Sequence, residues 1–167
     1  MFVQGDRVVY GIHGVCSVVD LQTRRVDKKD IEYYVLEPVD QPGTRYFVPT
    51  QNKAAAAKLQ PILTREALDE LLHSEDVDKN AWIEDEGRRK QYYRELINSG
   101  DRTALVCMVR TLHKQKKTQL SAGRKFHLCD ENFLRDAQKL LSSEFALVLG
   151  IQAGEVEDYV IQAINAD

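Results

Sequence analysis

The sequence predicts a two-domain protein of the β + α class, with a small N-terminal β-barrel followed by an all-α helical C-terminal domain. Three observations support this fold class. Over residues 1–50, short β-branched and aromatic runs alternate with glycine and proline, which is typical of closely connected strands. After residue 63, apolar residues recur at helical spacing. The length of 167 residues suits one ordinary domain or two small ones.

Strand candidates occupy the N-terminal part of the chain, at residues 7–10, 15–21, 31–36 and 44–48. Glycines follow the first run, Pro38 follows the third and Pro49 closes the fourth. Because closure removes the exposed strand edges of a small sheet, these runs favour a barrel. The predicted domains are residues 1–55 for the barrel and 56–167 for the helices.

Helices are predicted over the rest of the chain. Alanine-rich residues 51–59 form a short helix that Pro61 stops. Thr64 caps the next helix, because its hydroxyl can accept a hydrogen bond from the first turn. Gly100 and Asp101 provide a stop followed by a new cap. These later helices are expected at 65–72, about 80–98 with Asp78 or Asn80 as its cap, 101–117, 121–150 after Ser121, and 155–164. An interruption near residues 129–130 is left open.

The net charge of −3 hides an uneven distribution of charge along the chain. Residues 87–125 carry 11 Lys and Arg against 2 Asp and Glu, whereas residues 61–86 carry 2 against 9. Such crowding of like charge favours an anionic partner, most simply nucleic-acid phosphate, over a solvated helix face. An interaction with an acidic protein, without nucleic acid, is the alternative that the charge leaves open.

Catalytic and metal-binding motifs do not stand out. The sequence has no CxxC or HExxH pattern, no glycine-rich phosphate loop and no nucleophile elbow. Its three cysteines are widely spaced and odd in number, which argues against a disulfide framework. We therefore expect that the protein is not an enzyme, that it binds no cofactor and that it has no small-molecule substrate. Without a signal-peptide pattern or a long apolar run, a reduced cytoplasmic protein with no membrane span is expected.

Two further features have both a structural and a functional interpretation. Trp82, the only tryptophan, lies where the acidic stretch meets the basic one. It is equally compatible with a core position and with an aromatic wedge against bases. Arg45 and Phe47 share one side of a predicted strand, because side chains alternate with period two. They form either an ordinary barrel surface, which we favour on the sequence alone, or a docking edge for another protein.

Several motifs occur in a characteristic order from residue 2 to about residue 150. They are GDRVVY at 5–10 with His13 and Gly14, FVPTQN at 47–52, SGD at 99–101, the helix over 106–112, LSAGRK at 120–125, and AQKLL at 137–141 followed by Ser143, Glu144 and Ala146. Each motif is weak alone. As an ordered set, they resemble the CarD/CdnL family of bacterial transcription regulators.

The resemblance implies that the N-terminal barrel is SH3/Tudor-like and binds the β subunit of RNA polymerase. It implies that the helical domain contacts promoter DNA at the upstream edge of the transcription bubble. Members of the family stabilise the open complex without recognising a particular sequence. We expect the protein to act as a monomer.

Site residues follow from the resemblance position by position. Arg24 matches a family position that contacts polymerase, and a second such arginine position falls on Phe47, for which Arg45 is a substitute. The position of the family's DNA-wedging tryptophan falls on Glu86, so Trp82 is its candidate replacement one helical turn earlier. The expected polymerase-binding residues are Arg24, Arg25, Arg45, Phe47 and Pro49. The expected DNA-binding residues are Trp82, Arg88, Arg89, Lys90, Arg94, Lys114, Arg124 and Lys125.

Overall fold

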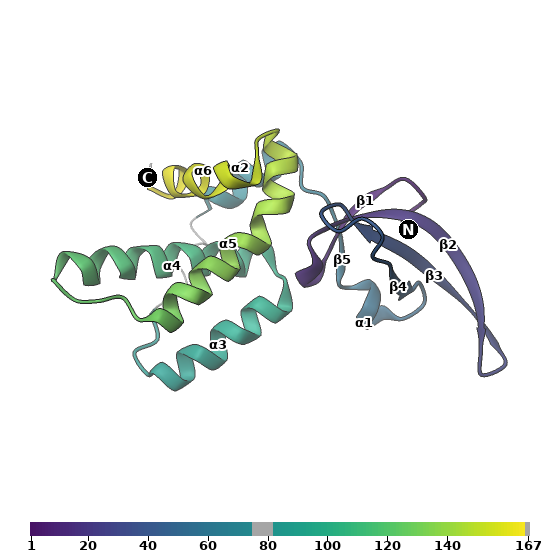
Figure 1. Ribbon diagram of the computed structural model, residues 1–167, viewed down its shortest axis with the longest axis horizontal. Helices are drawn as coiled ribbons and strands as arrows, with labels where there is room; N and C mark the ends of the chain where they lie inside the picture. The colour runs from purple at the N-terminus through teal and green to yellow at the C-terminus, as the bar shows by residue number, and fades with distance from the viewer. Residues whose placement is uncertain (75–81, 166–167) are drawn as a thin grey trace. The chain divides into compact units, whose positions relative to one another are not determined.

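The computed structural model describes residues 1–74 and 82–165. The chain divides into two compact units, Met1–Ile62 and Leu63–Asp167. The first is built mainly of strands and the second of helices (Figure 1), so the predicted order of a β part and an all-α part is confirmed. Asp78 and Asn80, the expected helix caps, lie outside the described residues. No helix in the described ranges is long and apolar enough to cross a membrane.

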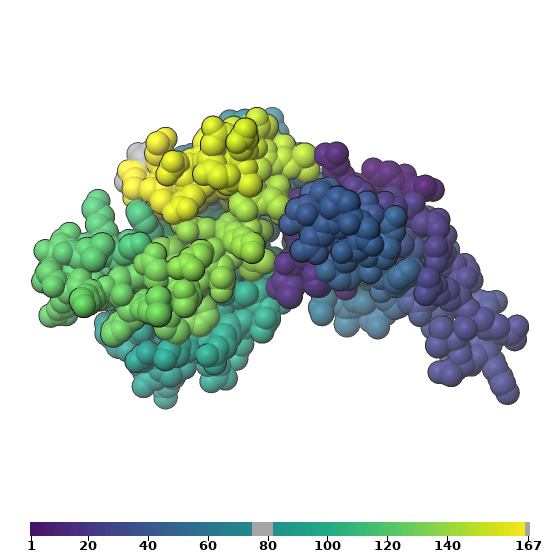
Figure 2. All heavy atoms as spheres, viewed as in Figure 1, coloured from purple at the N-terminus to yellow at the C-terminus, as the bar shows by residue number. Residues whose placement is uncertain are grey.

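The first unit is one antiparallel sheet with the strand order β4-β3-β2-β1-β5. Its strands are β1 (Arg7–Tyr10), β2 (Val15–Val26), β3 (Lys29–Pro38), β4 (Tyr46–Pro49) and β5 (Leu59–Pro61). β2 and β3 form a long hairpin whose turn residues, Asp27 and Lys28, have φ values of 50° and 65°. Two positive φ values are what a type I′ turn requires. The turn projects beyond the other strands (Figures 1 and 2).

The core of this unit lies against the inner parts of the hairpin strands. Cys16 and Val18 on β2 are buried, as are Tyr34 and Leu36 on β3, because side chains two residues apart share a face. A register shift follows Val18, and the remainder of β2 is half-buried or exposed. The outer half of the hairpin is therefore a surface feature.

The structure differs from the predicted elements near the end of this unit. The helix expected at 51–59 is only Lys53–Ala56 (α1), capped by the Asn52 side chain. The chain then forms β5, which pairs with β1. This pairing places residues 59–61 in the first unit, whereas the predicted boundary assigned them to the helical domain. The strands pair in the order β4-β3-β2-β1-β5, so β4 and β5 are the two edges of the sheet. Within the described residues, these two edges do not pair with each other to close the predicted barrel.

The second unit contains α2 (Arg65–Leu72), α3 (Glu86–Ser99), α4 (Arg102–Ser121), α5 (Leu128–Leu149) and α6 (Ala153–Asn165). The predicted caps are confirmed at Thr64, whose hydroxyl accepts the Ala67 N–H at 3.1 Å, and at Asp101, which caps α4. Gly100 has a left-handed φ of 64° after α3, where glycine carries no steric penalty.

The starts of α3 and α5 differ from the prediction. Asp85 caps α3 by accepting the Arg88 N–H at 2.8 Å, so Trp82 precedes this helix. Ser121 ends α4 instead of capping the next helix, and α5 begins at Leu128. Asp130 lies in the first turn of α5, which continues without a break to Leu149.

Helices α5 and α4 form the centre of the helical unit. α5 packs against α2, α3, α4 and α6. α4 packs against α2, α3 and α5 (Figure 1). Its residues 105–109 and Leu112 are all buried. Tyr93 from α3, Phe145 from α5 and Val160 from α6 complete this core. Burial of one helix from several sides gives the unit a rigid scaffold for its surface residues.

Candidate functional site

The outer half of the β2–β3 hairpin and the neighbouring strand β4 carry residues expected to bind polymerase. Arg24 and Arg25 are exposed, and Phe47 on β4 is 39% exposed. The guanidinium carbon of Arg24 lies 4.0 Å from the centre of the Phe47 ring, within the range of cation–π attraction. Two positions expected to contact polymerase are thus joined into one exposed feature that combines a cation with an aromatic ring.

Arg45 and Pro49 lie at the two ends of β4. Arg45 is exposed just before the strand and forms an ion pair with Glu37 on β3. Pro49 is half-buried and lies opposite Tyr33 in the β3–β4 register. Exposed ion pairs contribute little to stability, so Arg45 can exchange Glu37 for another carboxylate at small cost.

A cluster of aromatic rings in the same unit could not be predicted from the sequence. The His13 ring lies 5.0 Å from the ring of Tyr10 and 4.3 Å from the ring of Tyr46, measured between centroids. Burial and the nearby charge of Lys58 lower the pKa of His13. Two strands separate β1 from β4 in the sheet order, yet the Tyr10 and Tyr46 rings are 5.7 Å apart. The sheet is therefore strongly curved.

The helical unit gathers basic residues at one end. Lys116 on α4 pairs with Glu131 in the first turn of α5 at 2.9 Å. His127, just before α5, acts electrostatically on Glu86 at the start of α3. The start of α3 therefore lies near the start of α5, and Lys116, in the last part of α4, reaches the first turn of α5 (Figure 1). We call the exposed cations of α3, of the last part of α4 and of the segment between α4 and α5 the basic end: Arg88, Arg94, Lys114, Lys117, Arg124 and Lys125.

Lys90 belongs to the same region but has an acidic partner. Its Nζ lies 2.8 Å from Oε1 of Glu86, one helical turn away. The hydrogen bond from Lys90, together with its charge, lowers the pKa of Glu86. Because this pair is at the surface, it is weak and sensitive to salt. A phosphate can therefore replace Glu86 as the partner of Lys90.

Arg89 differs from Arg88 and Lys90 because its side chain is buried, with 4% of the residue exposed. Its Nε and Nη2 donate to the two carboxylate oxygens of Asp130 at 2.9 and 3.0 Å. Its Nη1 donates to the carbonyl oxygens of Ile83 and Glu84 at 2.9 and 3.4 Å. The resemblance places Arg89 on DNA, whereas the structure places its charge inside the helical unit.

The sequence contains a signal for this burial that the charge count overlooks. Asp130 and Glu144 share the buried face of α5, together with Phe133, Ala137 and Leu141, which recur at helical spacing. A charge on an apolar face requires a buried partner. Glu144 has its own, because Arg102 Nε and Nη2 donate to it at 2.6 Å each. Arg102 is therefore, like Arg89, not one of the exposed cations of the helical unit.

Trp82 lies just before α3 and is half-buried against the helical core. The guanidinium carbon of Arg89 lies 4.2 Å from the centre of the Trp82 ring. The same guanidinium binds the carbonyl oxygens of the next two residues. Trp82 is thus neither fully buried nor detached from the fold, since one face of its ring is covered by a cation and part of the residue remains accessible.

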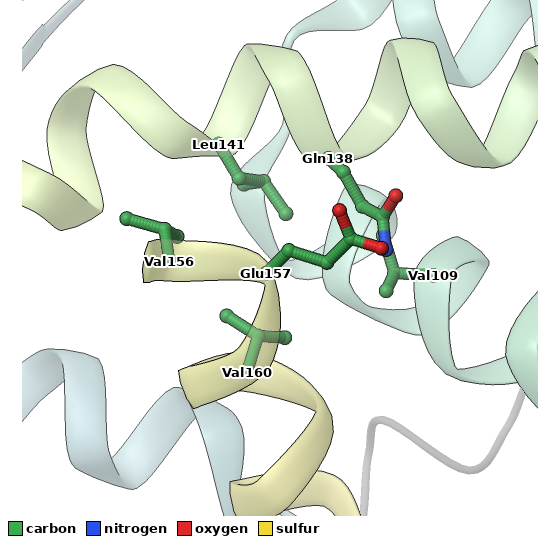
Figure 3. Close-up of a pocket in the computed structure, with 6 residues that line it drawn as sticks. All are labelled: Val109, Gln138, Leu141, Val156, Glu157 and Val160. Carbon is green, nitrogen blue, oxygen red and sulfur yellow. The ribbon is translucent and has the colours of Figure 1, made fainter. Parts of the chain in front are cut away.

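A small hollow lies between α4, α5 and α6 (Figure 3). Its lining is Val109, Gln138, Leu141, Val156, Glu157 and Val160. The cavity volume is about 10 Å³, which is enough for about one water molecule. Within the described residues, no cluster of three or more His, Cys, Asp or Glu is suited to hold a metal ion.

Two comparisons with protein families cover most of the chain. The family model of the CarD-like/TRCF RID domain matches residues 2–63. The family model of the CarD C-terminal domain matches residues 67–161. The first match covers the sheet unit, with the hairpin and β4. The second covers the helical unit, with the basic end, Trp82 and both buried ion pairs.

Proposed function

Because this chain belongs to the CarD family, we propose that it is a transcription regulator that binds bacterial RNA polymerase through its sheet unit and promoter DNA through its helical unit. The observation that carries this proposal is the separation of two surface types onto two units. An exposed cation–aromatic pair lies on one unit, and a group of exposed cations lies on the other. The protein acts as a bridge and performs no chemistry.

The proposed partner of the sheet unit is the β subunit of polymerase. Arg24 and Phe47 offer a positive charge and an apolar ring in one contact, and such residues are enriched at the centres of protein interfaces. Arg25, Arg45 and Pro49 surround this feature in the proposed contact. The strong curvature that brings Tyr10 to Tyr46 supports the expected SH3/Tudor-like shape of the unit.

The proposed partner of the helical unit is the DNA backbone at the upstream edge of the transcription bubble. Cations of the basic end contact phosphates, and phosphate contacts carry no sequence information. Binding of the chain alone is therefore weak and sensitive to salt. Attachment to polymerase raises the local concentration of the helical unit near DNA, so recruitment decides where a monomer of this protein acts.

Stabilisation of the open complex follows if Trp82 contacts distorted DNA better than closed duplex. An aromatic side chain inserted at a widened or kinked minor groove favours the deformed state. A ligand shifts an equilibrium only by its difference in affinity for the two states. The accessible part of Trp82 beside the basic end supports this role.

A capture experiment tests the polymerase contact. Immobilised chain should retain the purified β subunit, and Arg24→Glu should abolish retention because it reverses the charge beside Phe47. Arg7→Glu is the matched control, since Arg7 is exposed on β1. Equal loss with both substitutions would contradict a contact at the hairpin.

A salt titration tests the DNA contact. Arg88→Glu combined with Lys125→Glu should weaken binding to promoter DNA and lower the salt slope by about 2, one for each lost phosphate contact. Arg89 is left intact because its charge is buried against Asp130. Lys139→Glu, an exposed site farther along α5, is the control. Binding that no variant changes would instead favour an acidic protein as the partner of the basic end.

A further inference from the structure

Arg89 joins three parts of the helical unit through one guanidinium. It lies on α3, binds Asp130 at the start of α5, and reaches back to the segment before α3. Its hydrogen bonds to Asp130, Ile83 and Glu84 use four of the five N–H donors that an arginine carries. The remaining contact is with the ring of Trp82. Among the cations described on α3, Arg89 differs from Arg88, Lys90 and Arg94 in having a buried ion pair, backbone carbonyl partners and an aromatic contact together.

We infer that Arg89 and Asp130 form a positioning pair that holds Trp82 in the orientation in which it meets DNA. This inference rests on the proposed function. Asp130 fixes the plane of the guanidinium by a two-bond contact, which is the geometry that orients arginine most strictly. The guanidinium then packs on one face of the Trp82 ring and donates hydrogen bonds to the carbonyl oxygens of the next two residues. Arg89 thus acts on DNA through Trp82 and touches no phosphate itself.

The arrangement reduces the freedom of Trp82 before any partner arrives. An aromatic side chain that is already held loses less conformational entropy on binding than one that moves freely. The N-terminus of α5 favours the negative charge of Asp130, and Asp130 is 1% exposed. Because the pair is enclosed, salt screens it far less than it screens the cations at the surface. The orientation of Trp82 is therefore expected to persist at salt concentrations that release DNA.

The pair must be removed as a unit to separate positioning from stability. Removal of one partner leaves an unpaired buried charge, whereas replacement of both by apolar side chains of similar volume is tolerated. We therefore expect Arg89→Met with Asp130→Leu to keep the unit folded while it removes the contact with Trp82. Arg102→Met with Glu144→Leu is the matched control, because that pair is also buried in this unit and its bonds join α4 to α5 and Leu63.

The emission of Trp82 reports on its surroundings without any partner present, because the chain has one tryptophan. In the intact full chain, Arg89→Met with Asp130→Leu should shift the emission maximum to the red and increase quenching by acrylamide. Helix content by circular dichroism should be retained. The control pair should leave both emission and quenching as in the original chain.

An unshifted spectrum in the folded Arg89→Met, Asp130→Leu chain would overturn the inference. Arg89→Lys provides an independent arm in case the double substitution prevents folding. Lysine keeps a positive charge near Asp130 but lacks the planar fork that serves Trp82 and the two carbonyl groups together. It should also increase quenching of Trp82, and unaltered quenching in this variant would overturn the inference as well.

A double-mutant cycle connects positioning to function. With polymerase and promoter DNA, Trp82→Ala should shorten the open-complex lifetime in the original chain but have no further effect in the Arg89→Met, Asp130→Leu chain. Additive effects would contradict action through Trp82. If Trp82→Ala changes nothing in the original chain while the emission shift is observed, the DNA role of Trp82 fails and the positioning of Trp82 stands.

Discussion

Arg102 holds both carboxylate oxygens of Glu144 at 2.6 Å, and one of those oxygens also accepts the N–H of Leu63 at 3.3 Å. Leu63 is the first residue of the helical unit. One buried carboxylate therefore joins the start of this unit to α4 and α5. The arrangement anchors the chain where it enters the helices.

Loss of this carboxylate should destabilise the helical unit strongly. Glu144→Ala leaves the charge of Arg102 without its carboxylate partner, so we expect a loss of about 3–5 kcal/mol in the free energy of unfolding. Urea unfolding followed by circular dichroism measures it. Arg102→Met with Glu144→Leu should recover most of this loss. A Glu144→Ala chain as stable as the original would show that the pair contributes nothing.

The N-cap of α4 gives a smaller, local prediction. Asp101 accepts the N–H of Ala104 at 3.0 Å, and removal of such a cap costs about 1 kcal/mol. Asp101→Ala should lower the unfolding free energy by that amount. Asp101→Asn should be close to neutral, since asparagine caps equally well. A larger loss with Asn than with Ala would contradict the capping role.

His113 should make the stability of the helical unit depend on pH. Burial, with the charges of Lys116 and Lys117, lowers its pKa from 6.5, although Glu157 opposes this shift. The unfolded chain then binds a proton at His113 more readily than the folded chain does. The contribution of His113 to the free energy of unfolding is therefore complete above pH 6.5 and declines as the pH falls below that value.

Unfolding titrations at several pH values check this prediction. His113→Gln should reduce the decline of stability between neutral and mildly acidic pH. His13 has a pKa shifted in the same direction, but it lies in the sheet unit, and the difference between the original and variant chains isolates His113. An identical pH dependence in both chains would contradict the assignment.

Phe47 should contribute to polymerase binding through its ring. Phe47→Ala removes the surface on which Arg24 rests and should weaken retention of the β subunit at low and high salt alike, because the lost contact is apolar. Phe47→Tyr keeps the ring and should retain most of the binding. Surface plasmon resonance measures the change. Weakening confined to low salt would indicate that charge alone makes this contact.

Features that rest on neighbouring residues could be predicted from the sequence. Thr64, Gly100 and Asp101 mark helix ends because their hydrogen bonds and φ values involve residues within one turn. The strand at Arg7–Tyr10 was also predicted with its observed bounds. The division into a β part and a helical part follows from the change in apolar spacing, which is equally local.

Features that depend on distant partners could not be predicted from the sequence. β5 exists as a strand because Leu59 pairs with Tyr10, far earlier in the chain. Arg89 is one of three successive cations, and only Asp130, which follows it by 41 residues, removes it from the surface. The apolar neighbours of Asp130 on α5 indicate that a partner is needed, but they do not identify it. The contact between Arg24 and Phe47 likewise depends on the folded sheet.

The central claim is that one chain connects polymerase to promoter DNA through two separate surfaces. The lifetime of open complexes formed by bacterial polymerase, with and without the purified chain, tests it most directly. We predict that the chain lengthens this lifetime, and that Arg24→Glu, or Arg88→Glu with Lys125→Glu, abolishes the effect while Arg7→Glu and Lys139→Glu preserve it. A lifetime unchanged by the chain, or an Arg24→Glu variant as effective as the original, would contradict the claim.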